Sequence, residues 1–169
     1  YTIRLKRSQA IIALFLVLPL IIATWSTYFV EIKTLGLVTR IFGILFFAYA
    51  AINILRIIAK SEKVTRETIF AAIVAYLLIA LMWAFLYMIL EMASPGSFSF
   101  PDWGSRRETI RFEYFSFITI TTLGYGDIVP LTPAARSLAI FTSITGQMYV
   151  AIIIAALVSK YLSQKSSVN

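Results

Sequence analysis

The segment Thr121–Asp127 (the glycine segment) reads TTLGYGD, and its residue types and spacing suit the binding of a cation by backbone oxygens. Gly124 and Gly126 lie two residues apart, and glycine adopts positive φ without steric cost. An ordinary extended chain alternates its carbonyls, so positive φ at every second residue is needed to point successive carbonyls toward one axis. Such carbonyls, repeated around that axis, can replace the water shell of a potassium ion.

The neighbouring residues fit the same chemistry. The Thr122 hydroxyl can supply an innermost ring of oxygens, and Tyr125 can prop the segment from behind with its side chain away from the axis. The apolar residues Phe112–Thr121 predict a short helix that ends at the segment. The C-terminus of a helix carries roughly half a negative charge, which helps to hold a cation.

The composition indicates a membrane protein without catalytic chemistry. Of the 169 residues, 60% are hydrophobic and 14% charged, whereas a soluble domain is nearer one quarter charged. The chain has no cysteine and no histidine, which argues against an intramembrane hydrolase or a metalloprotease. We expect no enzyme activity and no cofactor. The net charge of +7 belongs to residues that flank apolar runs, so we expect membrane lipid and not nucleic acid as a partner.

Four apolar stretches are long enough to cross a bilayer as helices, because about 20 residues are needed. They are Gln9–Val30, Thr34–Leu55, Thr68–Leu90 and Ser137–Ser159. A fifth, Tyr114–Gly126, has only 13 residues and suits a re-entrant segment. The predicted fold is an all-α integral membrane protein with four transmembrane helices and a re-entrant pore helix and filter between the third and the fourth.

This pattern divides the chain into three parts. Residues 1–66 hold the first two helices and a basic linker, residues 67–162 form a pore domain, and residues 163–169 form a polar tail. The loop Glu91–Thr109 contains two prolines and two glycines, and we expect it to lack regular structure. A capping box at Ser105–Glu108 predicts that the short helix begins near Arg106.

The distribution of charge predicts the orientation. With a cytosolic N-terminus, nine basic and two acidic residues face the cytosol, against six of each sign on the other side. We therefore expect a plasma (inner) membrane protein with both termini in the cytosol. The basic linker is either this orientation signal alone or a contact for anionic lipid. Its basic residues are Arg56, Lys60, Lys63 and Arg66.

The glycine segment, with Pro130, Pro133 and the pair Gly146-Gln147 after it, resembles the pore domain of the potassium channel superfamily. The similarity covers about Thr68–Lys160 and is greatest to small bacterial ion channels, with two further helices before the pore. It implies passive, potassium-selective conduction. One such loop supplies a quarter of each carbonyl ring, so each chain needs three identical partners in a homotetramer.

The resemblance also implies roles for single residues. Potassium would bind at Thr122, Leu123, Gly124 and Tyr125, with Gly126 at the outer mouth and Thr121 as support. Asp127 would accept a hydrogen bond from Tyr114 behind the filter. Gly146 stands at the place of a hinge glycine, and close helix packing is an equal alternative. The residues that would line the cavity are Gln147, Val150 and Ile154, although Gln147 alternatively bonds a neighbouring helix.

Three positions depart from the pattern of the superfamily. Leu123 replaces the commoner valine, Ile118 stands where some members have glutamate, and Tyr114 stands where tryptophan is frequent. None of these changes alters the backbone carbonyls, so we expect selectivity to be kept. Two alternatives of function stay open, which are a less selective cation channel and a subunit of a potassium transporter.

Overall fold

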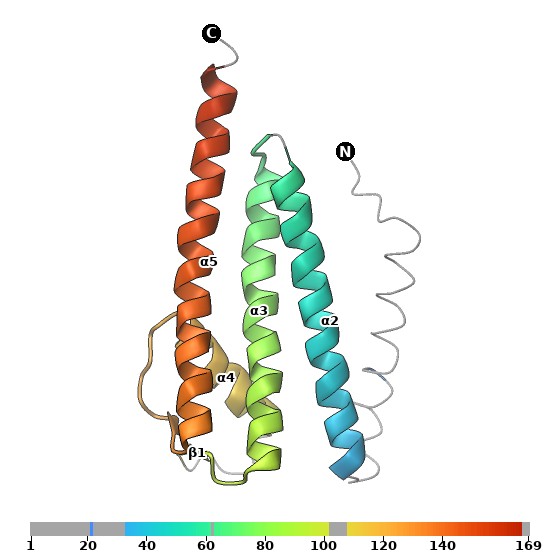
Figure 1. Cartoon of the computed structure of the whole chain (residues 1–169), viewed down its shortest axis with the longest axis vertical. Coiled ribbons are helices and arrows are strands. Elements are labelled where there is room, and N and C mark those ends of the chain that lie inside the picture. Colours follow the sequence, from blue (N-terminus) through green and yellow to red (C-terminus); the bar gives the residue numbers. More distant parts are fainter. Residues whose placement is uncertain (1–20, 22–32, 62, 102–107, 167–169) are drawn as a thin grey trace.

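The computed structural model describes residues 21, 33–61, 63–101 and 108–166. The helix expected over Gln9–Val30 lies outside these residues, except for Ile21. Residues 105–107, which begin the expected capping box, also lie outside them. The described chain is mostly helical (Figure 1). Its elements are α2 (Lys33–Lys60), α3 (Arg66–Ala93), β1 (Phe98–Ser99), α4 (Glu108–Ile120), β2 (Val129–Pro130) and α5 (Pro133–Ser166).

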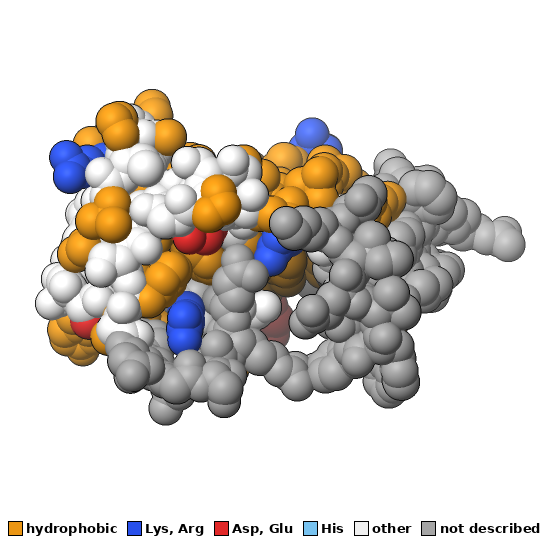
Figure 2. Space-filling model, turned by 90° about the horizontal axis from the view of Figure 1, so that it is seen from below, with side chains coloured by type: hydrophobic (Ala, Val, Ile, Leu, Met, Phe, Trp, Pro, Cys, Tyr) orange, Lys and Arg blue, Asp and Glu red, His pale blue; other side chains and the backbone are white. Residues whose placement is uncertain are grey.

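Among the described residues, three helices are long and apolar enough to cross a membrane, and they are α2, α3 and α5. Helices α2 and α3 form an antiparallel hairpin, and α5 runs beside α3 (Figure 1). Figure 2 looks from the end where β1 lies and shows many hydrophobic side chains at the surface of the described part. Large apolar side chains are also exposed along α2, α3 and α5, which suits a lipid environment.

All three long helices extend beyond their predicted ends, and the difference is largest for α5. It continues to Ser166, so the residues 163–166 that were expected to begin a polar tail are helical. Hydropathy marks where apolar residues stop, whereas a helix continues as long as its backbone hydrogen bonds do. Polar residues can therefore extend a membrane helix into water.

The prediction that the loop after α3 lacks regular structure is wrong in part. Strand β1 pairs with β2 in antiparallel register, with Phe98 opposite Pro130 and Ser99 opposite Val129. The Glu91 carboxylate accepts hydrogen bonds from the amides of Gly96 (2.8 Å) and Phe98 (3.2 Å). The two strands are about 30 residues apart in the sequence, so the local turn residues did not reveal their pairing. The Glu91 bonds are local and hold the turn that leads into β1.

An aromatic cluster holds α4 against α3. The buried Phe98 ring lies 5.5 Å from Tyr87 of α3, and 5.2 and 5.4 Å from Phe112 and Phe115 of α4, each in an edge-to-face arrangement. Each such pair contributes about 0.5–1.5 kcal/mol beyond its buried area. Buried Ser116 adds a hydrogen bond from its hydroxyl to the Ala80 carbonyl at 2.6 Å. Helix α4 is thus fixed on α3 by packing and by a polar contact.

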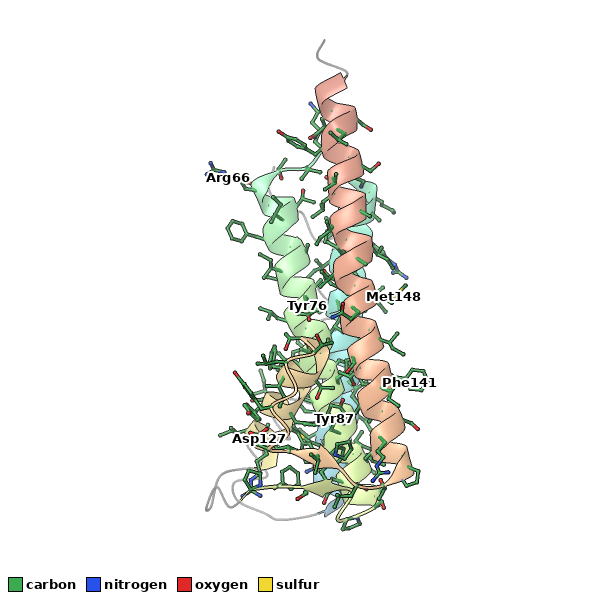
Figure 3. The ribbon with its side chains drawn as sticks, turned by 90° about the vertical axis from the view of Figure 1, so that its left-hand side faces the viewer. Arg66, Tyr76, Tyr87, Asp127, Phe141 and Met148 are labelled. Atoms are coloured by element: carbon green, nitrogen blue, oxygen red, sulfur yellow. The ribbon has the colours of Figure 1, made fainter. Side chains whose placement is uncertain are left out.

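A buried hydrogen bond also joins α3 to α5. Tyr87, which Figure 3 labels, and Thr142 are both fully buried, and their hydroxyl oxygens lie 2.5 Å apart. The Thr142 hydroxyl also bonds the Leu138 carbonyl at 2.9 Å within α5. A polar group in an apolar interior is costly unless it is paired, so this pair fixes how the two helices face each other.

At the opposite end of the molecule, Lys160 of α5 caps the end of α2. Its Nζ donates to the carbonyls of Ile58 (2.8 Å), Ala59 (2.9 Å) and Ser61 (2.7 Å). The last carbonyls of a helix have no partner inside the helix and carry partial negative charge. One ammonium group therefore satisfies three acceptors and ties α5 to the turn between α2 and α3.

Replacing Lys160 by methionine should free these carbonyls and loosen the turn. We expect the free energy of local unfolding at the α2–α3 turn to fall by about 1–2 kcal/mol, because hydrogen bonds from a partly exposed charged group are lost. Hydrogen exchange at the Ser61 amide should become faster. The control is Lys63→Met, which removes the same charge from an exposed side chain of this turn. Equal exchange in the two variants would contradict the capping role.

Candidate functional site

The glycine segment follows α4 directly. The chain enters α4 and leaves the glycine segment at the same end of the molecule. Strand β1 precedes α4 and β2 follows the segment, and the two strands are paired. Helix α4 has 13 residues, about 20 Å at 1.5 Å per residue, and is shorter than a bilayer core. The segment lies at the level of the lower half of α5, in the part of the molecule away from the C-terminus (Figures 1 and 3).

Positive φ recurs at every second residue of the segment. The values are 59° at Thr122, 52° at Gly124 and 81° at Gly126, and the only other positive φ among the described residues belongs to Gly96. The conformation expected at the two glycines is therefore present. The value at Thr122 was not predicted, since a β-branched residue rarely adopts it and such strain costs about 1–3 kcal/mol.

The C-terminus of α4 is anchored on all of its last four carbonyls. The Phe117 carbonyl accepts from the Thr121 amide and hydroxyl, and that of Ile118 from the amides of Leu123 (2.9 Å) and Gly124 (3.1 Å). The carbonyls of Thr119 and Ile120 are satisfied by side chains of other helices. These are Ser143 of α5 on Thr119 (3.3 Å) and Tyr76 of α3 on Ile120 (3.1 Å).

Sequence reasoning missed Tyr76 and Ser143, together with Tyr149. The Tyr76 ring lies 5.2 Å from that of Tyr149, whose hydroxyl donates to the Ala72 carbonyl at 2.6 Å. Figure 3 shows Tyr76 on α3 facing α5. The sequence does show that each of these residues places a hydroxyl inside an apolar span, and such a hydroxyl needs a hydrogen-bond partner in a membrane helix. It does not say which backbone oxygen is the partner.

The hydrogen bond predicted between Tyr114 and Asp127 is present. The Tyr114 hydroxyl donates to Asp127 Oδ2 at 2.6 Å, and Oδ1 accepts from the Ile128 amide at 3.0 Å. The carboxylate thus joins α4 to the last residue of the glycine segment. This bond raises the pKa of Tyr114 to about 12, because ionising the phenol next to a carboxylate is unfavourable.

The raised pKa of Tyr114 predicts a loss of stability in alkali. A group with a raised pKa stabilises the folded protein below its unfolded pKa of about 10, and this contribution disappears as the pH approaches 12. Thermal stability in detergent should fall less between pH 10 and 12 in Tyr114→Phe than in the wild type. The control is Tyr161→Phe on an exposed part of α5. If the two variants follow the same pH profile, the Tyr114–Asp127 bond does not stabilise the fold.

Gly146 lies where α5 touches the end of α4. A Cβ built on Gly146 would come within 1.9 Å of the Ile120 carbonyl oxygen and within 2.8 Å of Ile120 Cγ1. The glycine is therefore needed for close packing, which was one of the two alternatives. The hinge role stays a prediction.

The other predicted residues lie on the exposed side of the same region. Gln147 Nε2 is 3.2 Å from Thr122 Oγ1, so α5 contacts the glycine segment directly. Val150 and Ile154 are three and seven residues further along α5, on the same helix face, and both are exposed. Leu123 and Tyr125 are 55% and 67% exposed in the single chain.

Comparison with known proteins gives one family. The family model described as "Ion channel" matches residues 64–163, which is more than half of the chain and includes α3, α4, the glycine segment and most of α5. The rice protein "Two pore potassium channel c" (Oryza sativa subsp. japonica) is 33% identical over 87 residues, or 47% of this chain. The chain covers only 19% of that relative's length. No solved structure matches the chain significantly.

Proposed function

Because the chain belongs to the ion channel family and carries a pore domain of the potassium channel superfamily, we propose that it is one subunit of a potassium-selective channel. The glycine segment is its selectivity filter. The observation that carries this proposal is the alternation of positive φ at Thr122, Gly124 and Gly126, between residues with negative φ. This is the backbone pattern that turns successive carbonyls toward one axis.

The proposed mechanism is passive conduction. Carbonyls of Thr122, Leu123, Gly124 and Tyr125, with the Thr122 hydroxyl, replace the hydration shell of potassium as it crosses. Asp127 supports the filter through its bond with Tyr114. The last four carbonyls of α4 are hydrogen-bonded, so the partial negative charge expected at this helix end is partly compensated.

A homotetramer follows from the same mechanism, because each chain provides one quarter of a carbonyl ring. The exposure of apolar side chains supports it. Leu123 and Tyr125 stand more than half exposed, and a neighbouring subunit would cover them. In the assembly Gln147, Val150 and Ile154 would line the cavity below the filter.

The arrangement of charge supports the proposed orientation, with both termini cytosolic in the plasma (inner) membrane. The turn between α2 and α3 lies at the same end as the C-terminus, and the β1–β2 pair lies at the other (Figure 1). Basic side chains are exposed at this turn, and Arg66 points outward in Figure 3. We propose anionic lipid as their partner. The residues are Arg56, Lys60, Lys63 and Arg66.

Reconstitution into liposomes tests the function. The wild type should take up potassium much faster than sodium, and its reversal potential should follow the potassium gradient. Gly124→Ala should abolish this preference, because alanine at a φ of 52° costs roughly 1–2 kcal/mol per subunit. Equal permeability of the two ions in the wild type would favour a less selective cation channel. A monomer or dimer without flux would favour a transporter subunit.

A further inference from the structure

Gln147 of α5 reaches the first strained residue of the glycine segment. Its Nε2 lies 3.2 Å from Thr122 Oγ1, although the two residues are 25 apart in the sequence. Gln147 is a polar side chain on an exposed and mostly apolar face of α5. A polar group inside a membrane span is unfavourable unless it has a function or a partner. The contact with Thr122 therefore needs an explanation.

The contact depends on close docking of α5 on the end of α4. Gly146 leaves no room for a Cβ against the Ile120 carbonyl. One turn earlier, the Ser143 hydroxyl donates to the Thr119 carbonyl at 3.3 Å. Both contacts come from the helix that carries Gln147, so its amide is held at the glycine segment by rigid packing.

Thr122 has a strained backbone and a hydroxyl whose hydrogen bonds can be assigned. Its φ is 59°, and its amide donates to the Thr119 carbonyl at 3.0 Å. Its hydroxyl donates its one proton to the Thr121 carbonyl at 2.7 Å. The hydroxyl oxygen must then accept from Gln147, which places the amide nitrogen toward Thr122. One lone pair of the hydroxyl oxygen is left for a cation.

We propose that Gln147 is a positioning residue that fixes the Thr122 hydroxyl and so sets the affinity and ion preference of the innermost filter site. This inference rests on the proposed function. Gln147 acts through the Thr122 oxygen and does not need to touch the ion. Loss of its amide lets the hydroxyl rotate, and the innermost oxygen ring then binds potassium less tightly.

A double-mutant cycle on the full-length tetramer tests this inference. The variants are Gln147→Leu, Thr122→Val and the two combined, with Gln147→Met as a second amide-free variant should Gln147→Leu not assemble. The control is Thr145→Val, whose hydroxyl bonds the Phe141 carbonyl of its own helix. Two quantities are measured, which are potassium affinity by calorimetry and the reversal potential in mixed potassium and sodium.

Gln147→Leu should lower potassium affinity about 3- to 10-fold, as the loss of one neutral hydrogen bond predicts. Thr122→Val should lower it at least as much, and the double variant should equal Thr122→Val alone, because both changes remove one interaction. Thr145→Val should leave both quantities unchanged. Additive effects, or unchanged affinity in both amide-free variants, would overturn the inference.

The wild type separates this inference from the proposed function. If it binds potassium but does not conduct it, the proposed function fails and the affinity cycle still decides the role of Gln147. If it neither binds nor conducts potassium, both are wrong.

Discussion

Replacing Gly146 by alanine should abolish potassium conduction and lower the stability of the protein. The new Cβ would lie 1.9 Å from the Ile120 carbonyl oxygen and 2.9 Å from the Ile120 carbonyl carbon, and both are backbone atoms that no rotamer change can move. Helix α5 must then shift away from α4. Overpacking of this kind costs about 1–3 kcal/mol per subunit, and the shift would also break the Gln147–Thr122 contact.

Two other helical glycines serve as graded controls. A Cβ at Gly36 has Arg40 Nη1 at 3.8 Å as its nearest neighbour, so Gly36→Ala should be tolerated. A Cβ at Gly43 would meet the Phe85 ring at 2.8 Å, a side chain that can adjust in part. Thermal stability and potassium flux should therefore decrease in the order Gly36→Ala, Gly43→Ala, Gly146→Ala. A Gly146→Ala protein as stable as Gly36→Ala, with altered opening only, would favour the hinge alternative.

Replacing Gly126 by alanine should remove the preference for potassium over sodium. Gly126 has a φ of 81°, at which an L-residue is strained by about 1–2 kcal/mol. In the proposed tetramer, four subunits would place this strain around one axis, so the expected cost is roughly 4–8 kcal/mol per tetramer. A local return to negative φ would relieve it and turn a carbonyl away from the axis. The reversal potential in mixed potassium and sodium measures the result.

Gly96 is a matched control for this prediction. Its φ is also 81°, and a Cβ at either glycine would meet no atom within 4 Å. Gly96→Ala should thus cost the same strain per chain, about 1–2 kcal/mol, in the turn after α3. We expect it to lower thermal stability slightly and to leave selectivity unchanged. Equal loss of selectivity in both variants would show that the effect comes from general destabilisation and not from the filter.

The sequence alone predicted the features that depend on local composition, and one contact that follows from a family resemblance. Apolar runs predicted three membrane-capable helices close to where the structure has them, although polar residues carry α5 on to Ser166. The two-residue spacing of Gly124 and Gly126 predicted positive φ at both. The aromatic residue at Tyr114 and the carboxylate at Asp127 predicted the bond between them, through the resemblance to a known family.

Only the tertiary structure decided the contacts between distant residues. It placed Gly146 against the end of α4, Tyr76 on the Ile120 carbonyl, and Lys160 on the end of α2. It also put Thr122 at a φ of 59°, against the local preference of a β-branched residue. The physical reason is common to all four. Local preference and hydropathy act over a few residues, whereas these positions are set by which backbone oxygens the packed helices bring within reach.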